Sequence, residues 1–284
     1  MKQILLLTLS TCAFAALSDT VHSSISTYVE SKSFTNSKQK DDGITYGVGP
    51  DVHYKHSAYK ITYEHTDTNT KQPPLPYDLK IDKLFLKYGY EFNDTFGVNL
   101  NYISILNDNL AITDGGKIYG LGFSYNHLEH LSSNFTQYLS EYDDFNIYQS
   151  DLRIDYDTHL GKVHMKISSI TKYIIVDEEN PNGFTKNAED DYLTTGIKLH
   201  AHYKTYHFGA GAYFGKRVFA IMDDGFKVQH HAMEINKTYA LGAGKVFLPF
   251  IVRFQYVFQE ATELSIQNPD VKVDMFRFVG NYKF

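Results

Sequence analysis

The residues that could do chemistry in this sequence are mostly histidines and paired carboxylates. His200, His202 and His207 lie close together. Residues i and i+2 of a β-strand share one face, so two of these imidazoles could meet at one metal ion. Lys198 and Lys204 flank them on that face, where two positive charges would repel a cation. The pattern therefore favours an ordinary polar surface, with no metal and no cofactor.

Hydrolytic chemistry would need a histidine beside a serine, or a carboxylate pair that activates water. The sequence contains the strings HSS at 22–24, HLS at 130–132 and HTD at 65–67. Acidic segments bring Asp close to His by chance, and we find no convergent acid/base group in the sequence. We therefore expect a protein that is not an enzyme, and a hydrolase stays an alternative.

The segments that carry these side chains have the two-residue period of β-strands. In residues 80–92, Leu84 and Leu86 alternate with Lys83 and Lys87, which gives one apolar and one charged face. The chain contains 23 Tyr and 20 Phe but no Trp. Beyond the N-terminus, no apolar run approaches the roughly 20 residues of a membrane-spanning helix. Strands with a lipid-facing side would explain this combination, because polar lumen-facing neighbours lower the mean hydropathy.

Fourteen segments of this kind can be marked along the chain. Most are long enough to cross a bilayer, which takes roughly 9–11 residues of a tilted strand. Their connections alternate between short and long, as do the periplasmic turns and external loops of a barrel. We predict an all-β fold, a transmembrane antiparallel β-barrel of about 14 strands, with about 12 as the alternative. The segments are 23–34, 43–54, 58–67, 80–92, 96–107, 116–127, 133–142, 147–158, 162–175, 190–204, 207–221, 229–243, 248–261 and 271–284.

Residues 1–15 have the pattern of a secretory signal peptide. Lys2 supplies the positive charge, an apolar stretch begins at Ile4, and the run AFA at 13–15 fits a small-x-small cleavage site. We predict a signal peptide over 1–15 and a single outer-membrane barrel domain over 16–284.

The last segment, 271–284, carries an aromatic residue at every second position toward its end, except for Gly280, and stops on an aromatic residue. This pattern resembles the C-terminal assembly signal of Gram-negative outer-membrane β-barrels. The resemblance implies export to the bacterial outer membrane and recognition by the barrel-assembly machinery. In size and strand number the chain is also similar to the monomeric fourteen-stranded porin G family, although no motif carries individual residues across. The assembly-signal positions are Phe276, Phe278, Tyr282 and Phe284.

With the apolar faces turned toward lipid, the opposite faces line the lumen, and there bases outnumber acids. We see no separate plug domain and expect a water-filled channel with a weak preference for anions. The external loops carry acidic pairs such as Asp41-Asp42 and Asp223-Asp224, which would be solvated or bridged by divalent cations to lipopolysaccharide. The predicted pore-lining residues are Lys83, Lys87, Arg153, Lys166, Lys198, His200, His202, Arg253, Arg277 and Lys283.

These expectations together favour an outer-membrane porin for passive diffusion of small hydrophilic solutes or ions. Its partners would be outer-membrane lipid and lipopolysaccharide, the assembly machinery and the solutes themselves, with no nucleic acid. Two alternatives stay open, a barrel hydrolase that acts at the rim and a structural or adhesive barrel whose lumen is closed.

Overall fold

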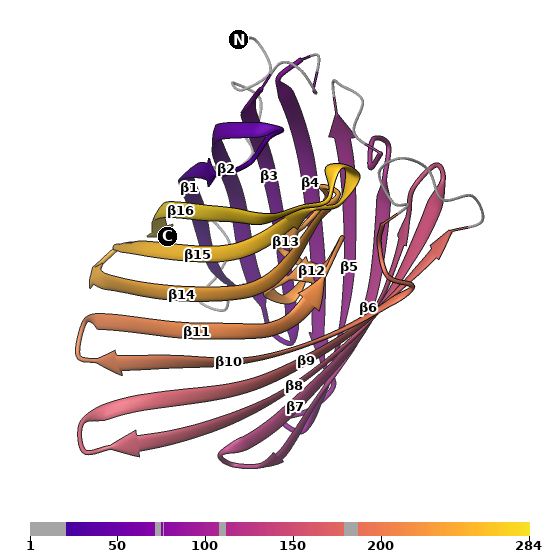
Figure 1. The fold of residues 1–284 in the computed structure, drawn as a ribbon. Helices are drawn as coiled ribbons and strands as arrows, with labels where there is room; N and C mark the ends of the chain where they lie inside the picture. The colour runs from indigo at the N-terminus through magenta and orange to yellow at the C-terminus, as the bar shows by residue number, and fades with distance from the viewer. Residues whose placement is uncertain (1–20, 72–74, 76, 108–111, 179–186) are drawn as a thin grey trace, which may run out of the picture.

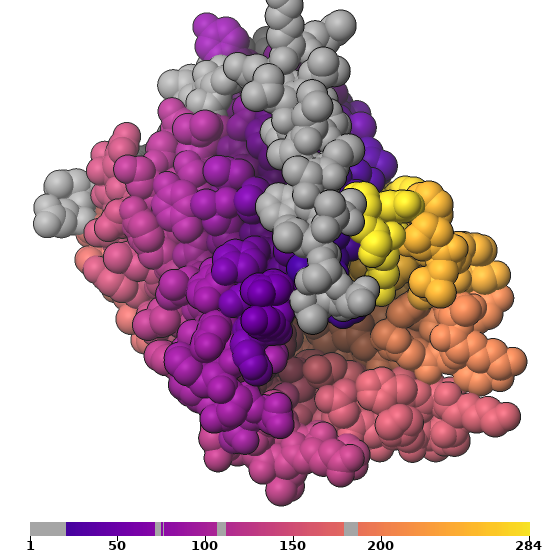
Figure 2. All heavy atoms as spheres, turned by 180° about the vertical axis from the view of Figure 1, so that it is seen from behind, coloured from indigo at the N-terminus to yellow at the C-terminus, as the bar shows by residue number. Residues whose placement is uncertain are grey.

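The computed structural model describes residues 21–71, 75, 77–107, 112–178 and 187–284, so the predicted signal peptide lies outside the described residues. Fourteen antiparallel strands close into a barrel in which β1 pairs with both β2 and β16 (Figure 1). Figure 2 shows this closure from behind, where the yellow C-terminal strand approaches the indigo N-terminal strands. The predicted fold class and the strand number of 14 are confirmed.

The barrel strands are 11 to 16 residues long, which is enough to cross a bilayer when tilted. In the described part of the chain, no helix is long and apolar enough to span a membrane. The barrel strands are β1 (Val21–Thr35), β2 (Lys40–Tyr54), β3 (Ser57–Thr70), β4 (Leu79–Glu91), β5 (Phe96–Asn107), β6 (Lys117–Leu128), β7 (Leu131–Glu141), β8 (Phe145–Leu160), β9 (Val163–Glu178), β10 (Asp191–Tyr203), β11 (Tyr206–Arg217), β14 (Met233–Phe247), β15 (Phe250–Glu263) and β16 (Asn268–Lys283).

The outer surface of the barrel is apolar. On β4, Leu84 and Leu86 are exposed, whereas Phe85 between them is 1% exposed and faces inward. Exposed large apolar side chains of this kind recur around the barrel, including Leu152, Phe254 and others on neighbouring strands. Such a belt is unfavourable in water but suits a hydrocarbon environment. The alternation seen in the sequence therefore separates a lipid-facing side from a lumen side.

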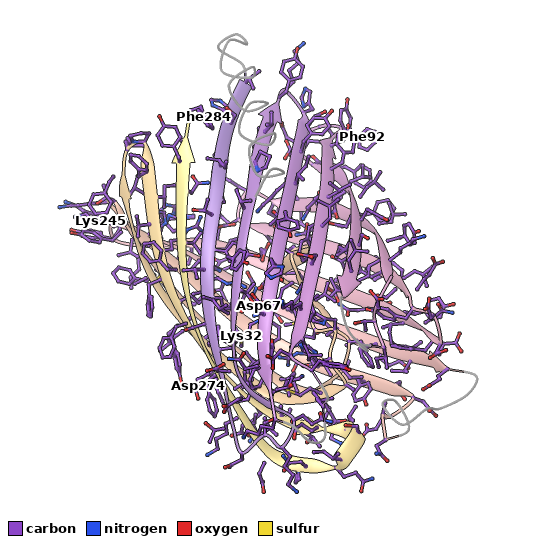
Figure 3. All side chains as sticks on the ribbon, turned by 90° about the horizontal axis from the view of Figure 1, so that it is seen from above. Lys32, Asp67, Phe92, Lys245, Asp274 and Phe284 are labelled. Carbon is purple, nitrogen blue, oxygen red and sulfur yellow. The ribbon has the colours of Figure 1, made fainter. Side chains whose placement is uncertain are left out.

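Aromatic rings gather at the end of the barrel where the short turns lie. The ring centroids of Phe250 and Tyr282 are 5.0 Å apart, as are those of Tyr282 and Phe284. Phe92 stacks on Phe96 at 5.5 Å, and Figure 3 shows Phe92 and Phe284 at the same end of the molecule. This arrangement is typical of the aromatic girdle at a membrane–water interface.

Two predicted segments extend into a stretch that is not part of the barrel wall. The segment predicted at 207–221 is β11, which ends at Arg217, and the one predicted at 229–243 is β14, which begins at Met233. Between them the chain leaves the barrel wall. The segment 133–142, on which the strand number depended, is β7.

Candidate functional site: the lumen and its inner loop

The inner loop, residues 218–232, connects β11 to β14 and lies within the ring of strands (Figure 1). It contains a short antiparallel pair, β12 (Ile221–Met222) and β13 (Lys227–Val228), joined through the 3-10 helix η2 (Asp223–Gly225). The sequence analysis predicts no separate plug domain, but it does not predict that this connection folds into the lumen. A long connection occupies the space that the wall side chains leave.

The first half of the inner loop is apolar and packs against the wall. Residues 218–222 are at most 5% exposed, and they share one hydrophobic cluster with Ile103, Ile147 and Ile174 on β5, β8 and β9. Burial of this much apolar surface is favourable. This contact anchors the loop to one side of the lumen.

Hydrogen bonds fix the same segment at Ile221. The side-chain amide of Gln149 donates to the Ile221 carbonyl at 2.7 Å, and the Ile221 N–H donates to Gln149 Oε1 at 2.8 Å. Lys172 Nζ also donates to that carbonyl, at 3.0 Å. Gln149 is completely buried. Its side-chain amide satisfies the N–H and the carbonyl of Ile221, as the backbone of a neighbouring strand would.

The turn of the inner loop is acidic and meets bases on the wall. Lys198 Nζ donates to Asp223 Oδ1 at 2.9 Å, and Arg153 pairs with Asp224. Lys87 donates to the Asp224 carbonyl at 3.2 Å. The placement of Asp223-Asp224 in an external loop is therefore wrong, because these carboxylates neutralise wall bases inside the barrel.

These contacts change how both loop carboxyls ionise. Lys198 lowers the pKa of Asp223 far below its usual range, although burial acts in the opposite direction. Burial also raises the pKa of Asp224, but Arg153 and Lys87 outweigh it, so this pKa too is lowered. Both groups are therefore ionised at neutral pH and hold the turn of the inner loop against the wall.

Three more of the predicted pore-lining bases are paired with acids along the wall. Lys83 is 4% exposed, and Arg277 joins β16 to β1 across the closure of the barrel. Paired charges are less available to a passing ion than free ones. The ion pairs are Lys83–Glu64 (2.5 Å), Lys166–Asp155 (3.7 Å) and Arg277–Glu30 (2.8 Å).

The remaining predicted positions lie toward the short turns. His202 packs against His207 with ring centroids 4.2 Å apart, and His200 lies two residues before it on β10. Arg253 on β15 and Lys283 at the end of β16 form no ion pair within the described residues. Among those residues, no group of three or more His, Cys, Asp or Glu side chains is placed to hold a metal ion.

The string at 65–67 forms a polar cluster with β4. His65 Nδ1 lies 2.7 Å from Asp82 Oδ1, and His65 Nε2 lies 3.2 Å from Asp67 Oδ2. Tyr63 donates to the same Asp82 oxygen at 2.5 Å. Two carboxylates could orient this imidazole as a base. The two H-x-S strings lie elsewhere in the chain, at 22–24 and 130–132, and within the described residues neither of their serines hydrogen-bonds to the histidine of its string.

The inner loop leaves a cavity of about 80 Å³ on the opposite side of the lumen. Its wall comes from β14, β15, β16, β1, β3 and β4, and its other side is formed by loop residues 227–231. Charged and apolar side chains both line it. The space that stays open beside the inner loop is therefore narrow and chemically mixed.

The predicted assembly-signal residues lie at the end of β16 and just beyond it. Phe276, Phe278 and Phe284 are about half exposed on the outer surface, and the Tyr282 ring packs between those of Phe250 and Phe284, edge-on to Phe284. The Phe284 N–H donates to the Ser23 carbonyl at 3.0 Å, which ties the last residue to β1.

The inner loop was missed although the sequence carries a signal for it. The run VFAIM at 218–222 places apolar residues at consecutive positions, which a wall strand with one polar face would not tolerate. The acidic turn DDG at 223–225 follows directly. A break in alternation inside a long connection indicates a segment that is buried on all sides.

Sequence comparison finds no matching family model and no matching curated protein. Several solved structures of outer-membrane proteins share the fold. The toluene transporter TbuX of Ralstonia pickettii aligns with a TM-score of 0.56 at 9% identity, over 94% of this chain and 90% of its own. The outer-membrane protein Omp33 of Acinetobacter baumannii aligns with a TM-score of 0.50 at 9% identity, over 93% and 99%. The NanC porin aligns with a TM-score of 0.50 at 8% identity, over 91% and 100%.

Proposed function

We propose that this protein is an outer-membrane channel for passive diffusion of small hydrophilic solutes or ions, and that the inner loop forms its constriction. The observation that carries the proposal is a closed 14-strand barrel, apolar outside, whose lumen is lined by ionised groups and narrowed from one side. The fold of the solved porins and transporters supports an outer-membrane channel at this coarse level.

The ionised groups around the constriction support a role in transit of polar solutes. Lys87, Arg153 and Lys198 are in direct contact with Asp223 and Asp224 of the inner loop. Buried charges are costly unless they are paired or hydrated. The free energy of a polar solute in transit would therefore be lower beside these ion pairs than beside the apolar residues 218–222. The pore-lining role of the predicted bases is part of this proposal.

The alternatives have less support. The structural neighbours are porins and transporters, which fits a protein that is not an enzyme. His65 and its two carboxylates would be the group to test for hydrolysis by an activated water. A closed structural barrel would need the cavity beside the inner loop to be sealed.

Several accompanying features belong to the same proposal. Export would use residues 1–15 as a signal peptide, and assembly would use the aromatic end of β16. The long loops opposite the aromatic girdle would then face outward, toward lipopolysaccharide.

Solute entry into proteoliposomes tests the proposal directly. Vesicles that contain the refolded barrel should swell in small neutral solutes such as glycerol and in small amino acids, and swelling should slow steeply as solute size increases. Protein-free vesicles and vesicles with heat-unfolded protein serve as controls. Swelling no faster than in these controls would contradict a channel and favour the closed-barrel alternative.

A further inference from the structure

We propose that the cavity beside the inner loop is a binding site for a small aliphatic carboxylate of the size of acetate. The inference rests on the proposed channel only for how the ligand reaches the site. It deepens that proposal by naming the class of solute that pauses at the constriction. Charge, unsatisfied donors and an apolar wall each point to this ligand.

The first observation is an excess of positive charge in a largely buried place. Three cations converge on one carboxylate, that of Glu30, which is 2% exposed. Lys83 pairs with Glu64, which also accepts a hydrogen bond from Tyr28. Four bases therefore line the cavity against two acids, and burial of unbalanced charge is costly. The bases are Lys32, Lys83, Lys227 and Arg277, and the acids are Glu30 and Glu64.

The second observation is that two hydrogen-bond donors at this site, on Lys227 and His230, have weak partners or none within the described residues. Among the described residues, the partners of Lys227 Nζ are Met275 Sδ at 3.7 Å and Glu30 Oε2 at 3.7 Å, which are a weak acceptor and a distant one. His230 is 4% exposed, and its Nδ1 has no hydrogen-bond partner. Both side chains come from the inner loop and line the cavity. A carboxylate could accept from both, because it has two oxygens.

The third observation is the apolar part of the lining, which favours an organic ion over phosphate or sulfate. Five apolar side chains of the wall face the same space as the cations. An aliphatic tail would lose its contact with water there. A cavity of 150 Å³ holds benzene, so about 80 Å³ leaves room for about four heavy atoms. The apolar lining residues are Phe34, Met233, Ile235, Val273 and Met275.

Other charges near the site do not remove the excess. Asp223 lies close enough to influence Lys227 and Arg277, but it is paired with Lys198. Lys40 is buried nearby against the Phe34 ring at 5.7 Å, and it interacts with the buried carboxylate of Glu263, so it is not counted in the excess. Burial lowers the pKa of His230 well below its usual value, so this imidazole is neutral at pH 7. A neutral imidazole can donate through one nitrogen without adding to the excess.

Isothermal titration of the detergent-solubilised barrel at pH 7 and constant ionic strength tests the site. We expect saturable binding of one acetate, tighter than propionate, which exceeds the size of the cavity, and tighter than phosphate, sulfate or chloride. Lys227→Gln should weaken acetate binding at least tenfold. Lys245→Gln is the matched control, because Lys245 points away from the barrel (Figure 3) and contacts the rings of Tyr206 and Phe247, so it should bind as the wild type does.

Three results would overturn the inference. They are the absence of saturable acetate binding, equal or tighter binding of an inorganic anion, and unchanged binding by Lys227→Gln. If Lys227→Gln does not fold, His230→Phe replaces it and should show the same loss. Binding is measured without a membrane, so a channel that conducts but does not bind acetate would remove this inference alone. A barrel that binds acetate but does not conduct would remove the channel and keep the site.

Discussion

Single side chains determine how the inner loop is held in place. Gln149 satisfies both backbone groups of Ile221, and the local pattern of β8 does not distinguish it from the other polar residues of that strand. Its partner lies 72 residues away, and no local pattern reports such a contact. Alternation predicted only that Gln149 shares a face with Asp151 and Arg153, which is correct.

We expect Gln149→Leu to loosen the inner loop. The substitution leaves the Ile221 N–H without its acceptor, and an unsatisfied buried group costs about 1–3 kcal/mol. The variant should unfold at lower denaturant concentration and pass larger solutes in the swelling assay. Gln255→Leu is the control, because Gln255 is also on the lumen face but has no such bond to the loop. Equal behaviour of the two variants would contradict the anchoring role of Gln149.

The two faces of β4 give a second prediction at this scale. Leu86 faces outward, and an Arg there would cost roughly 2–4 kcal/mol near the bilayer midplane. Lys87→Leu loses a hydrogen bond to the Asp224 carbonyl, worth about 1 kcal/mol. Leu86→Arg should therefore be the more destabilising change in a refolding titration in lipid vesicles. The reverse order would show that the inside and outside of β4 are exchanged.

At the scale of elements, alternation located the barrel strands well, because each strand has lipid on one side and the lumen on the other. The same rule failed at 218–222, where both sides are buried and the side chains no longer alternate. It also placed Asp223-Asp224 in an external loop, because an acidic turn has the same sequence pattern in water and beside buried bases. The interior contacts of a long connection depend on residues far away in the sequence.

The depressed pKa values of Asp223 and Asp224 predict how the inner loop responds to acid. The unperturbed pKa of Asp is about 4. A carboxyl whose pKa is lowered by folding contributes stability above that value, and the contribution is lost only as pH falls through the lower folded pKa. Conductance should therefore change little through these pairs between pH 7 and pH 5. Opening through their protonation should need pH well below 4.

The double variant Asp223→Asn, Asp224→Asn provides the comparison for the pH series. It lacks both carboxylates, so it should conduct more than the wild type already at pH 7. A wild-type channel that opens near pH 6 would contradict the electrostatic attachment of the inner loop, unless the double variant opened in the same way.

The end of β16 gives a prediction about assembly. Deletion of Phe284 removes one aromatic ring of the girdle and the hydrogen bond from its N–H to Ser23. We expect the truncated protein to accumulate in the periplasm and to be degraded. The measurement is heat-modifiable migration of outer-membrane fractions, and normal levels of folded barrel would exclude the assembly role. Phe247→Ala, which removes another exposed ring near the short turns, controls for loss of aromatic surface.

At the scale of the whole molecule, the barrel provides a wall, and in the proposed channel the inner loop would form the constriction. Acids on the wall and on the inner loop pair with many of the bases predicted to line the pore. The predicted anion preference consequently depends less on a general excess of lumen bases. It depends more on the four bases and two acids that line the cavity beside the inner loop.

Single-channel recording in planar bilayers tests this account most directly. The wild-type barrel should show discrete conductance steps and a reversal potential that indicates weak anion preference under a salt gradient. Replacement of residues 219–231 by a short Gly-Ser linker should increase the step size several-fold, because it removes the constriction. If that variant does not fold, Gln149→Leu should show a smaller increase in the same direction. Equal steps in wild type and loop variants, or no conductance in any of them, would contradict a channel constricted by the inner loop.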